Sequence, residues 1–122
     1  MKKNFFKLFK TKKPIIAMVH FPALPGSPLY DEKKGLHFIY QSVEKDLINL
    51  QKAGVDAVMF GNENDRPYEL KVNSATLSTM SYMIGKLSEK ISIPFGVNVL
   101  WDPTSTIALA VSTNAKFVRE IF

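Results

Sequence analysis

The chain has 122 residues, of which 46% are hydrophobic, and its formal net charge is +5. This hydrophobic content supports one folded domain and argues against an intrinsically disordered protein. The chain contains no cysteine, which excludes disulfides, thiolate metal sites and cysteine nucleophiles.

The positive charge belongs to the first thirteen residues, which contain six lysines and no acidic residue. In the rest of the chain ten basic residues stand against eleven acidic ones, a net charge of −1. A nucleic-acid partner would need a positive face on the folded domain, so we expect none. No apolar run reaches the ~18 residues of a membrane span, and lysines interrupt the segment that most resembles a signal peptide. We therefore expect a cytoplasmic protein.

Residues 1–13 form the first expected unit, a basic amphipathic helix or tail that precedes the domain of residues 14–122. Phe5, Leu8 and Phe9 are spaced by three and four residues, which places them on one helical face. This face could dock on the apolar surface of the domain or touch an anionic membrane. A helix of two turns is only marginally stable unless it packs on something, so membrane contact is the minor alternative.

Four strands are predicted because four segments are apolar almost throughout, as strands buried on both faces of a parallel sheet are. The loop that follows the first strand contains three prolines and one glycine, which exclude regular structure there. The predicted strands cover residues 15–21, 55–60, 93–101 and 115–122.

Apolar residues at helical spacing predict a helix between each pair of successive strands. The first helix has Leu36, Tyr40, Val43, Leu47 and Leu50 on one face and ends before Gly54. The second runs to Leu87 from a candidate N-cap at Ser74, and the third runs from Asp102-Pro103 to about Thr113, where Asn114 can take the left-handed conformation.

The resulting order is β-α-β-α-β-α-β, which implies an α/β fold with parallel strands joined by right-handed crossovers. Two architectures fit this order: an open doubly wound sheet, and the amino-terminal half of a (β/α)8 TIM barrel. A full barrel takes ~250 residues, about twice the length of this chain. In the half-barrel one face of the sheet has no helices, and such a face favours association.

Polar residues follow all four predicted strands, and sites in both architectures form at the carboxyl ends of parallel strands. This convergence is the main evidence for a site in the sequence. The residues are His20 after the first strand, Asn62, Glu63 and Asp65 after the second, Asn98, Trp101 and Asp102 at the third, and Arg119 and Glu120 at the fourth.

The candidate catalytic residues are His20, Glu63 and Asp102. A histidine at this place could act as a general base or could be a hydrogen-bonded residue at the edge of the core. Glu63 lies in a polar loop, where carboxylates are commonly solvated or cap a turn. Asp102 is first of all a helix cap.

The candidate substrate-binding residues are Asn62, Asn98, Arg119 and Glu120. An amide in the middle of a buried strand must find partners, so Asn98 either points at a ligand or ties the core together. Arg119 and Glu120 point to opposite faces of a regular strand, and a guanidinium at the site would suit a phosphate or a carboxylate.

A divalent cation held by Glu63, Asp102 and Glu120 has no ligand spacing in its support, so no metal site is predicted. The sequence contains no glycine-rich nucleotide loop, nucleophile elbow or zinc-protease motif, and it identifies no cofactor.

Four strings of this sequence together resemble the BtpA/SgcQ family: KKPIIAMVHFPALPGSP, AGVDAVMFGNENDRPY, PFGVNVLWDP and FVREIF. The family is similar to phosphate-binding (ribulose-phosphate binding) TIM barrels, and its members are about twice as long as this chain. The resemblance therefore implies the half-barrel and maps the strand-end positions of the family onto His20, Asn62, Glu63, Asn98, Asp102 and Arg119.

The function that the resemblance implies is that of a truncated barrel enzyme, inactive alone, for a small phosphorylated or nucleoside-like substrate. Its partners would be a second half-barrel or another copy of the chain. The alternatives are a non-enzymatic assembly or biogenesis factor, for which the family is named, and a decayed gene fragment.

Overall fold

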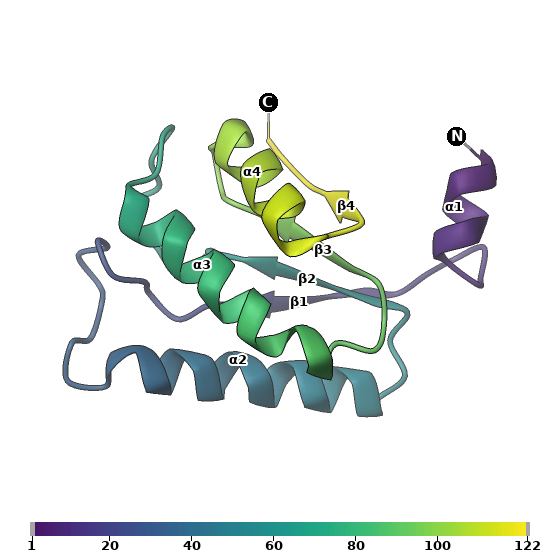
Figure 1. The fold of residues 1–122 in the computed structure, drawn as a ribbon, viewed down its shortest axis with the longest axis horizontal. Helices are drawn as coiled ribbons and strands as arrows, with labels where there is room; N and C mark the ends of the chain where they lie inside the picture. The colour runs from purple at the N-terminus through teal and green to yellow at the C-terminus, as the bar shows by residue number, and fades with distance from the viewer. Residues whose placement is uncertain (1, 122) are drawn as a thin grey trace.

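The computed structural model describes residues 2–121, and its centre is a four-stranded parallel sheet in the order β1-β2-β3-β4 (Figure 1). The alternation of parallel strands and helices agrees with the order predicted from the sequence. The strands are β1 (Ile16–His20), β2 (Ala57–Gly61), β3 (Phe95–Asn98) and β4 (Phe117–Val118). The helices are α1 (Lys2–Leu8), α2 (Gly35–Lys52), α3 (Ser74–Leu87), the 3-10 helix η1 (Ser88–Lys90) and α4 (Pro103–Thr113).

The hydrophobic core lies on the helix-covered face of the sheet, which we call the outer face. The strand register places Val19, Phe60 and Val97 side by side, and all three are fully buried. They share one core cluster with residues of all three crossover helices, such as Val43 of α2 and Leu109 of α4. A strand order that follows the chain, with the crossover helices on one face, is the arrangement expected of half a barrel.

The opposite face of the sheet, which we call the inner face, carries no helix among the described residues. One register row on this face contains Met18, Met59, Gly96 and Phe117. An open groove of about 390 Å³ runs over it and is lined by Ile16, Met18, Met59, Phe117, Val118 and Arg119.

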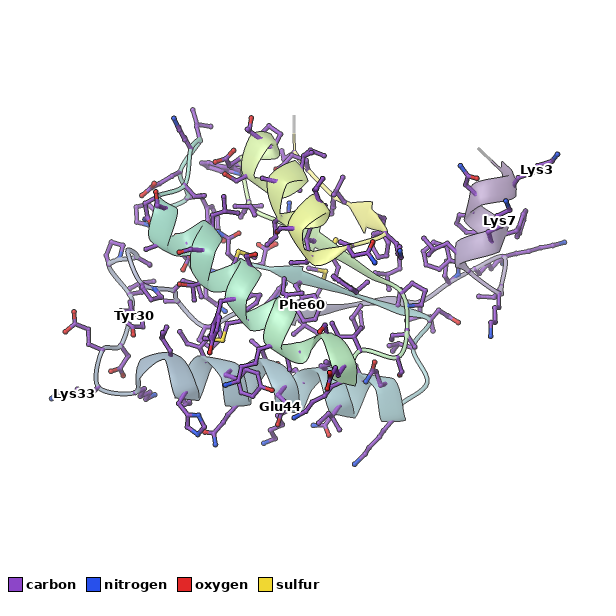
Figure 2. The ribbon with its side chains drawn as sticks, viewed as in Figure 1. Lys3, Lys7, Tyr30, Lys33, Glu44 and Phe60 are labelled. Atoms are coloured by element: carbon purple, nitrogen blue, oxygen red, sulfur yellow. The ribbon has the colours of Figure 1, made fainter. Side chains whose placement is uncertain are left out.

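Helix α1 lies beyond the amino-terminal ends of the strands, away from α2 and α3 (Figure 1). Phe9, directly after the helix, is 7% exposed, and its ring centroid lies 5.9 Å from that of Phe117. Phe5 packs in turn on Phe9 at 5.0 Å, whereas Lys3 and Lys7 are exposed and project from the helix (Figure 2). Through Phe9 this segment thus contacts the sheet. None of the described helices is long and apolar enough to cross a membrane.

The prediction that the first strand is buried on both faces is wrong. Of its residues only Val19 is buried, and Ile16 is 40% exposed. The physical reason is that β1 is an edge strand of this sheet and that no helix among residues 2–121 covers its inner face. The third and fourth strands are also shorter than predicted, because the chain turns away after Asn98 and after Val118; residue 122 lies outside the described residues.

The helices agree closely with those predicted from the sequence, apart from the N-cap of α3 and the core residue in the first turns of α2. Asp102 is the N-cap of α4, and Asn114 closes that helix with a φ of 62°, as predicted. The N-cap of α3 is Asn73, whose side chain accepts a hydrogen bond from the Thr76 amide, so Ser74 is the first helical residue. Leu36 of α2 is exposed, and Ile39 takes its expected place in the core.

We expect Gly96→Ala to lower the free energy of unfolding by about 1–3 kcal/mol, because an added methyl group must displace a packed ring. The Phe117 ring lies over Gly96 so closely that a Cβ atom built there would overlap it. Urea denaturation followed by circular dichroism measures the effect. Gly85→Ala is the matched control: nothing lies within 4 Å of its Cβ position on α3, and alanine should stabilise the helix by roughly 0.5–1 kcal/mol. Equal effects of the two substitutions would contradict this packing.

Candidate functional site

An ion pair between Glu63 and Arg119 is at the centre of the candidate site, at the carboxyl edge of the sheet. Arg119 Nη2 donates to Glu63 Oε1 over 2.9 Å. The two residues follow β2 and β4, so the pair spans the intervening strand β3. The Arg119 side chain is 49% exposed, and Nη1 lies 3.9 Å from Met18 Sδ on the inner face. The guanidinium is therefore held in place while part of it stays open to solvent.

Asn98, the last residue of β3, lies next to this ion pair and is completely buried. Its Nδ2 donates to the backbone oxygen of Arg119 over 2.5 Å, which fixes the end of β4 against β3. Its Oδ1 has no hydrogen-bond partner, the one such buried side-chain atom in the part of the chain that the structure describes. A buried acceptor without a partner is energetically unfavourable, so Oδ1 is a candidate ligand-binding atom.

His20 ends β1 in the register row that contains Gly61 and Asn98. Its side chain is exposed, and its Cδ2 atom lies 3.9 Å from the place where a Cβ atom of Gly61 would be. The small residue in β2 therefore allows the imidazole to lie over the inner face, on the same side as Met18. The structure thus brings His20, Glu63, Asn98 and Arg119 to one edge, and we call these four residues the strand-end cluster.

Asn62 hydrogen-bonds within the protein and ties three loops together. Its Oδ1 accepts from the Leu100 amide over 2.7 Å, and its Nδ2 donates to Asp65 Oδ2 over 3.4 Å. Asp65 in turn accepts from the Leu24 amide over 2.7 Å. Burial raises the pKa of the Asp65 carboxyl, although both of these hydrogen bonds act against the shift. These contacts join the loops that follow β1, β2 and β3 and keep the strand-end cluster in place.

Asp102 is buried beneath the loop that follows β2, where its carboxylate accepts three hydrogen bonds. Oδ1 accepts from the Ser105 amide over 3.0 Å; Oδ2 accepts from the Ser105 hydroxyl over 2.7 Å and from the Val72 amide over 2.9 Å. Burial on its own would raise the pKa of this carboxyl, but these hydrogen bonds outweigh it and lower the pKa. Asp102 thus anchors α4 to the loop before α3.

Glu120 reaches α4 rather than the ion pair. Its Oε2 accepts from the Thr106 hydroxyl over 2.6 Å, and Thr106 Oγ1 also accepts from the Val99 amide over 2.9 Å. Arg119 and Glu120 lie beyond β4, which ends at Val118, and they contact different parts of the fold. The sequence did not predict that Thr106 joins Glu120 to the end of β3, because the position of Thr106 in the first turn after Asp102 is the only local signal for it.

The residues considered for a divalent cation do not converge. Glu63 pairs with Arg119, Asp102 with Ser105 and Val72, and Glu120 with Thr106. Within residues 2–121 no three histidine, aspartate or glutamate side chains are grouped as metal ligands. The chemistry of the strand-end cluster is instead that of an arginine, a carboxylate, an imidazole and a free amide oxygen.

Comparisons with known proteins give one family and several relatives. The model of the BtpA family matches residues 11–122. The putative sgc region protein SgcQ of Escherichia coli is 51% identical over 112 residues, which are 92% of this chain and 42% of that protein. An uncharacterized protein of Pyrococcus horikoshii is 37% identical over 88% of this chain and 41% of its own length. The photosystem I biogenesis protein BtpA of Synechocystis is 31% identical over 95% of this chain and 40% of its own length.

This chain therefore spans about two fifths of the length of these relatives. No solved structure matches it.

Proposed function

Because the chain belongs to the BtpA family, we propose that its strand-end cluster binds a small phosphorylated or nucleoside-like molecule at the mouth of an α/β barrel. The observation that carries this proposal is the half-exposed Arg119 guanidinium, which lies at the carboxyl edge of parallel strands beside the unpartnered Oδ1 of Asn98. This edge is where ligands of barrel proteins bind.

An anionic group is the ligand feature that Arg119 recognises. A guanidinium presents planar N–H donors that match the oxygens of a phosphate or carboxylate. In the free protein Glu63 holds one of these nitrogens at 2.9 Å. A phosphate that carries more negative charge would compete with this carboxylate for Arg119 and would be bound through charge-assisted hydrogen bonds.

A hydroxyl-bearing part of the ligand fits the other two members of the cluster. Asn98 Oδ1 can accept a hydrogen bond from a sugar hydroxyl, which would satisfy this buried atom. His20 lies exposed in the same register row, and the two ring nitrogens of an imidazole can act as a proton donor and a proton acceptor. In an enzymatic reaction His20 and Glu63 are the residues of this chain that would transfer protons.

The catalytic step would need the rest of a barrel, since this chain provides four strand ends and a full barrel has eight. We therefore propose that the chain binds the ligand weakly and turns it over only with the inner face covered. A role in assembly or biogenesis, as the name of the Synechocystis relative states for that protein, is the alternative. A role in assembly does not explain why polar side chains gather at the carboxyl edge of the sheet, whereas a ligand site at this edge does.

The proposal is tested by titrating the chain with ribose 5-phosphate and adenosine monophosphate, with ribose and adenosine as uncharged controls. Trp101 is the single tryptophan and packs at 5.3 Å on Tyr68, whose hydroxyl donates to the Glu63 backbone oxygen. The fluorescence of Trp101 should therefore respond to ligand binding near Glu63. We expect Arg119→Gln to weaken the binding of the phosphorylated ligands by about 10–100-fold, the effect of losing a hydrogen bond to a charged group.

The matched control is Lys116→Gln, which removes one exposed positive charge just before β4. It should change the affinity less than threefold if binding is local to the site. Binding that weakens equally in both variants would indicate general attraction of anions and would overturn the proposal. A chain that binds none of these ligands would favour a role in assembly or a decayed fragment.

A further inference from the structure

We propose that the inner face and the two edges of the sheet bind a second copy of this chain, so that two copies close one eight-stranded parallel barrel. The proposed contact involves the backbone of the edge strands β1 and β4 and the apolar surface of the inner face. One consequence, a mouth built from both copies, rests on the function proposed above.

The edges of the sheet suit each other for such a pairing. β1 and β4 are the edge strands, and all four strands run in the same direction (Figure 1). A rotation of 180° about an axis along the strands brings β4 of one copy beside β1 of the other in parallel orientation. The same rotation joins the second pair of edges, so the contact closes on itself and does not grow into a filament. Twice four strands is the number in a closed (β/α)8 barrel.

The surface that this pairing covers is apolar. Ile16 of β1 and Val118 of β4 are each 40% exposed, and the groove between them is floored by Met18, Met59 and Phe117. Parallel sheets occur almost only with both faces covered, because their strands are apolar on both sides. A second copy would cover this groove and remove both open edges from water.

The charges on this face do not oppose the contact of two identical surfaces. Arg119 is balanced by Glu63 at 2.9 Å, and the chain beyond residue 13 has a net charge of −1. The lysine-rich segment that contains Lys3 and Lys7 lies at the amino-terminal end of the strands (Figure 2). The inner face can therefore meet a copy of itself without the repulsion that six lysines would cause.

The pairing would also make the mouth of the barrel a composite site. The end of β4 in one copy would lie beside the end of β1 in the other, so Arg119 would face the partner's His20. Within one copy, two strands separate these residues. If the proposed ligand site exists, each copy would thus contribute a residue to the site of the other.

Engineered cysteines test the pairing without any ligand, so a failure here is distinct from a failure of the ligand proposal. The natural chain contains no cysteine. Three double variants pair positions that face the same side of the sheet, namely Phe117→Cys with Ile16→Cys, Phe117→Cys with Met18→Cys, and Val118→Cys with Ala17→Cys, and so cover the neighbouring registers. Within one copy β1 and β4 are roughly 14 Å apart, three strand spacings, whereas a disulfide needs Cα atoms within about 7 Å. A disulfide between them can therefore form only between copies.

We expect the unmodified chain to be a dimer by light scattering and at least one double variant to give a covalent dimer under mild oxidation. The control combines Val111→Cys with Ile16→Cys, since Val111 is 79% exposed on α4 and far from the proposed contact. Rapid cross-linking of the control would overturn the pairing, as would a monomeric unmodified chain.

A charge placed on the edge gives a second test, which does not depend on oxidation. Val118→Lys should convert the dimer to a monomer, whereas Val111→Lys should not. Circular dichroism verifies that each variant is folded. A dimer that persists in a folded Val118→Lys variant would show that the copies associate elsewhere.

Discussion

Replacing Phe60 with alanine should lower the free energy of unfolding by about 3–5 kcal/mol, the usual effect of removing a large aromatic side chain from a core. Phe60 is fully buried in β2 and lies between the sheet and the helices (Figure 2). Its ring centroid is 6.2 Å from that of Phe21 and 5.7 Å from that of Phe95. Urea denaturation followed by circular dichroism measures the loss.

The matched control for this substitution is Phe38→Ala. Phe38 belongs to α2 and is 40% exposed, so we expect a loss below about 1 kcal/mol from the lost contact with Lys34. A similar loss in both variants would show that the core is not on the outer face of the sheet.

Replacing Asp102 with alanine should cost about 2–4 kcal/mol of stability, the sum of a lost N-cap and an unpaired backbone amide. The N-cap hydrogen bonds that would be lost are those that Ser105 donates to the Asp102 carboxylate. The backbone amide left without a partner would be that of Val72. The control is Asp31→Ala, which removes an exposed carboxylate that accepts from the Lys33 and Lys34 amides and should cost less than about 1 kcal/mol.

The effect of Asp102 should also depend on pH in a defined direction. The folded protein holds the pKa of this carboxyl below the ordinary value of an aspartate. Its contribution to stability is therefore complete above that value and is lost as the pH falls through the folded pKa. Unfolding curves of the wild type and Asp102→Ala should differ most near neutral pH and converge in strong acid. A constant difference across this range would mean that the ionised carboxylate does not provide the stabilisation.

The same substitution bears on function, because Asp102 was a candidate catalytic residue. All three of its described contacts are donors of this chain's own loop and helix. We therefore expect Asp102→Ala to act on ligand binding through the placement of α4 and of the loop that follows β3.

Features set by neighbouring residues could be predicted from the sequence. Asp102 followed by Pro103 marks the start of α4, and Asn114 marks its end, because capping depends on a few adjacent side chains. The alternation of apolar strands and helices likewise gave the parallel sheet. The error at Ser74 is of the same local kind, since Asn73 is an equally good cap one residue earlier.

Features that depend on distant segments could not be predicted. The sequence pattern places Glu63 and Arg119 after two strands but does not say that those strands flank β3 closely enough for a 2.9 Å contact. The exposure of Ile16 likewise depends on what covers β1 and not on its own residue type. The unpartnered oxygen of Asn98 appears only when the backbone of Arg119 is known to occupy its amide nitrogen.

The central claim is that the strand-end cluster is the ligand site, and amide NMR of the labelled chain tests it most directly. On titration with ribose 5-phosphate, we predict that the signals that shift first belong to His20, Glu63, Asn98 and Arg119, together with the Arg119 side-chain N–H groups. These residues share one edge of the sheet, so one bound molecule can perturb all of them. Shifts confined to the lysine-rich residues 1–13, or no shifts at all, would contradict the claim.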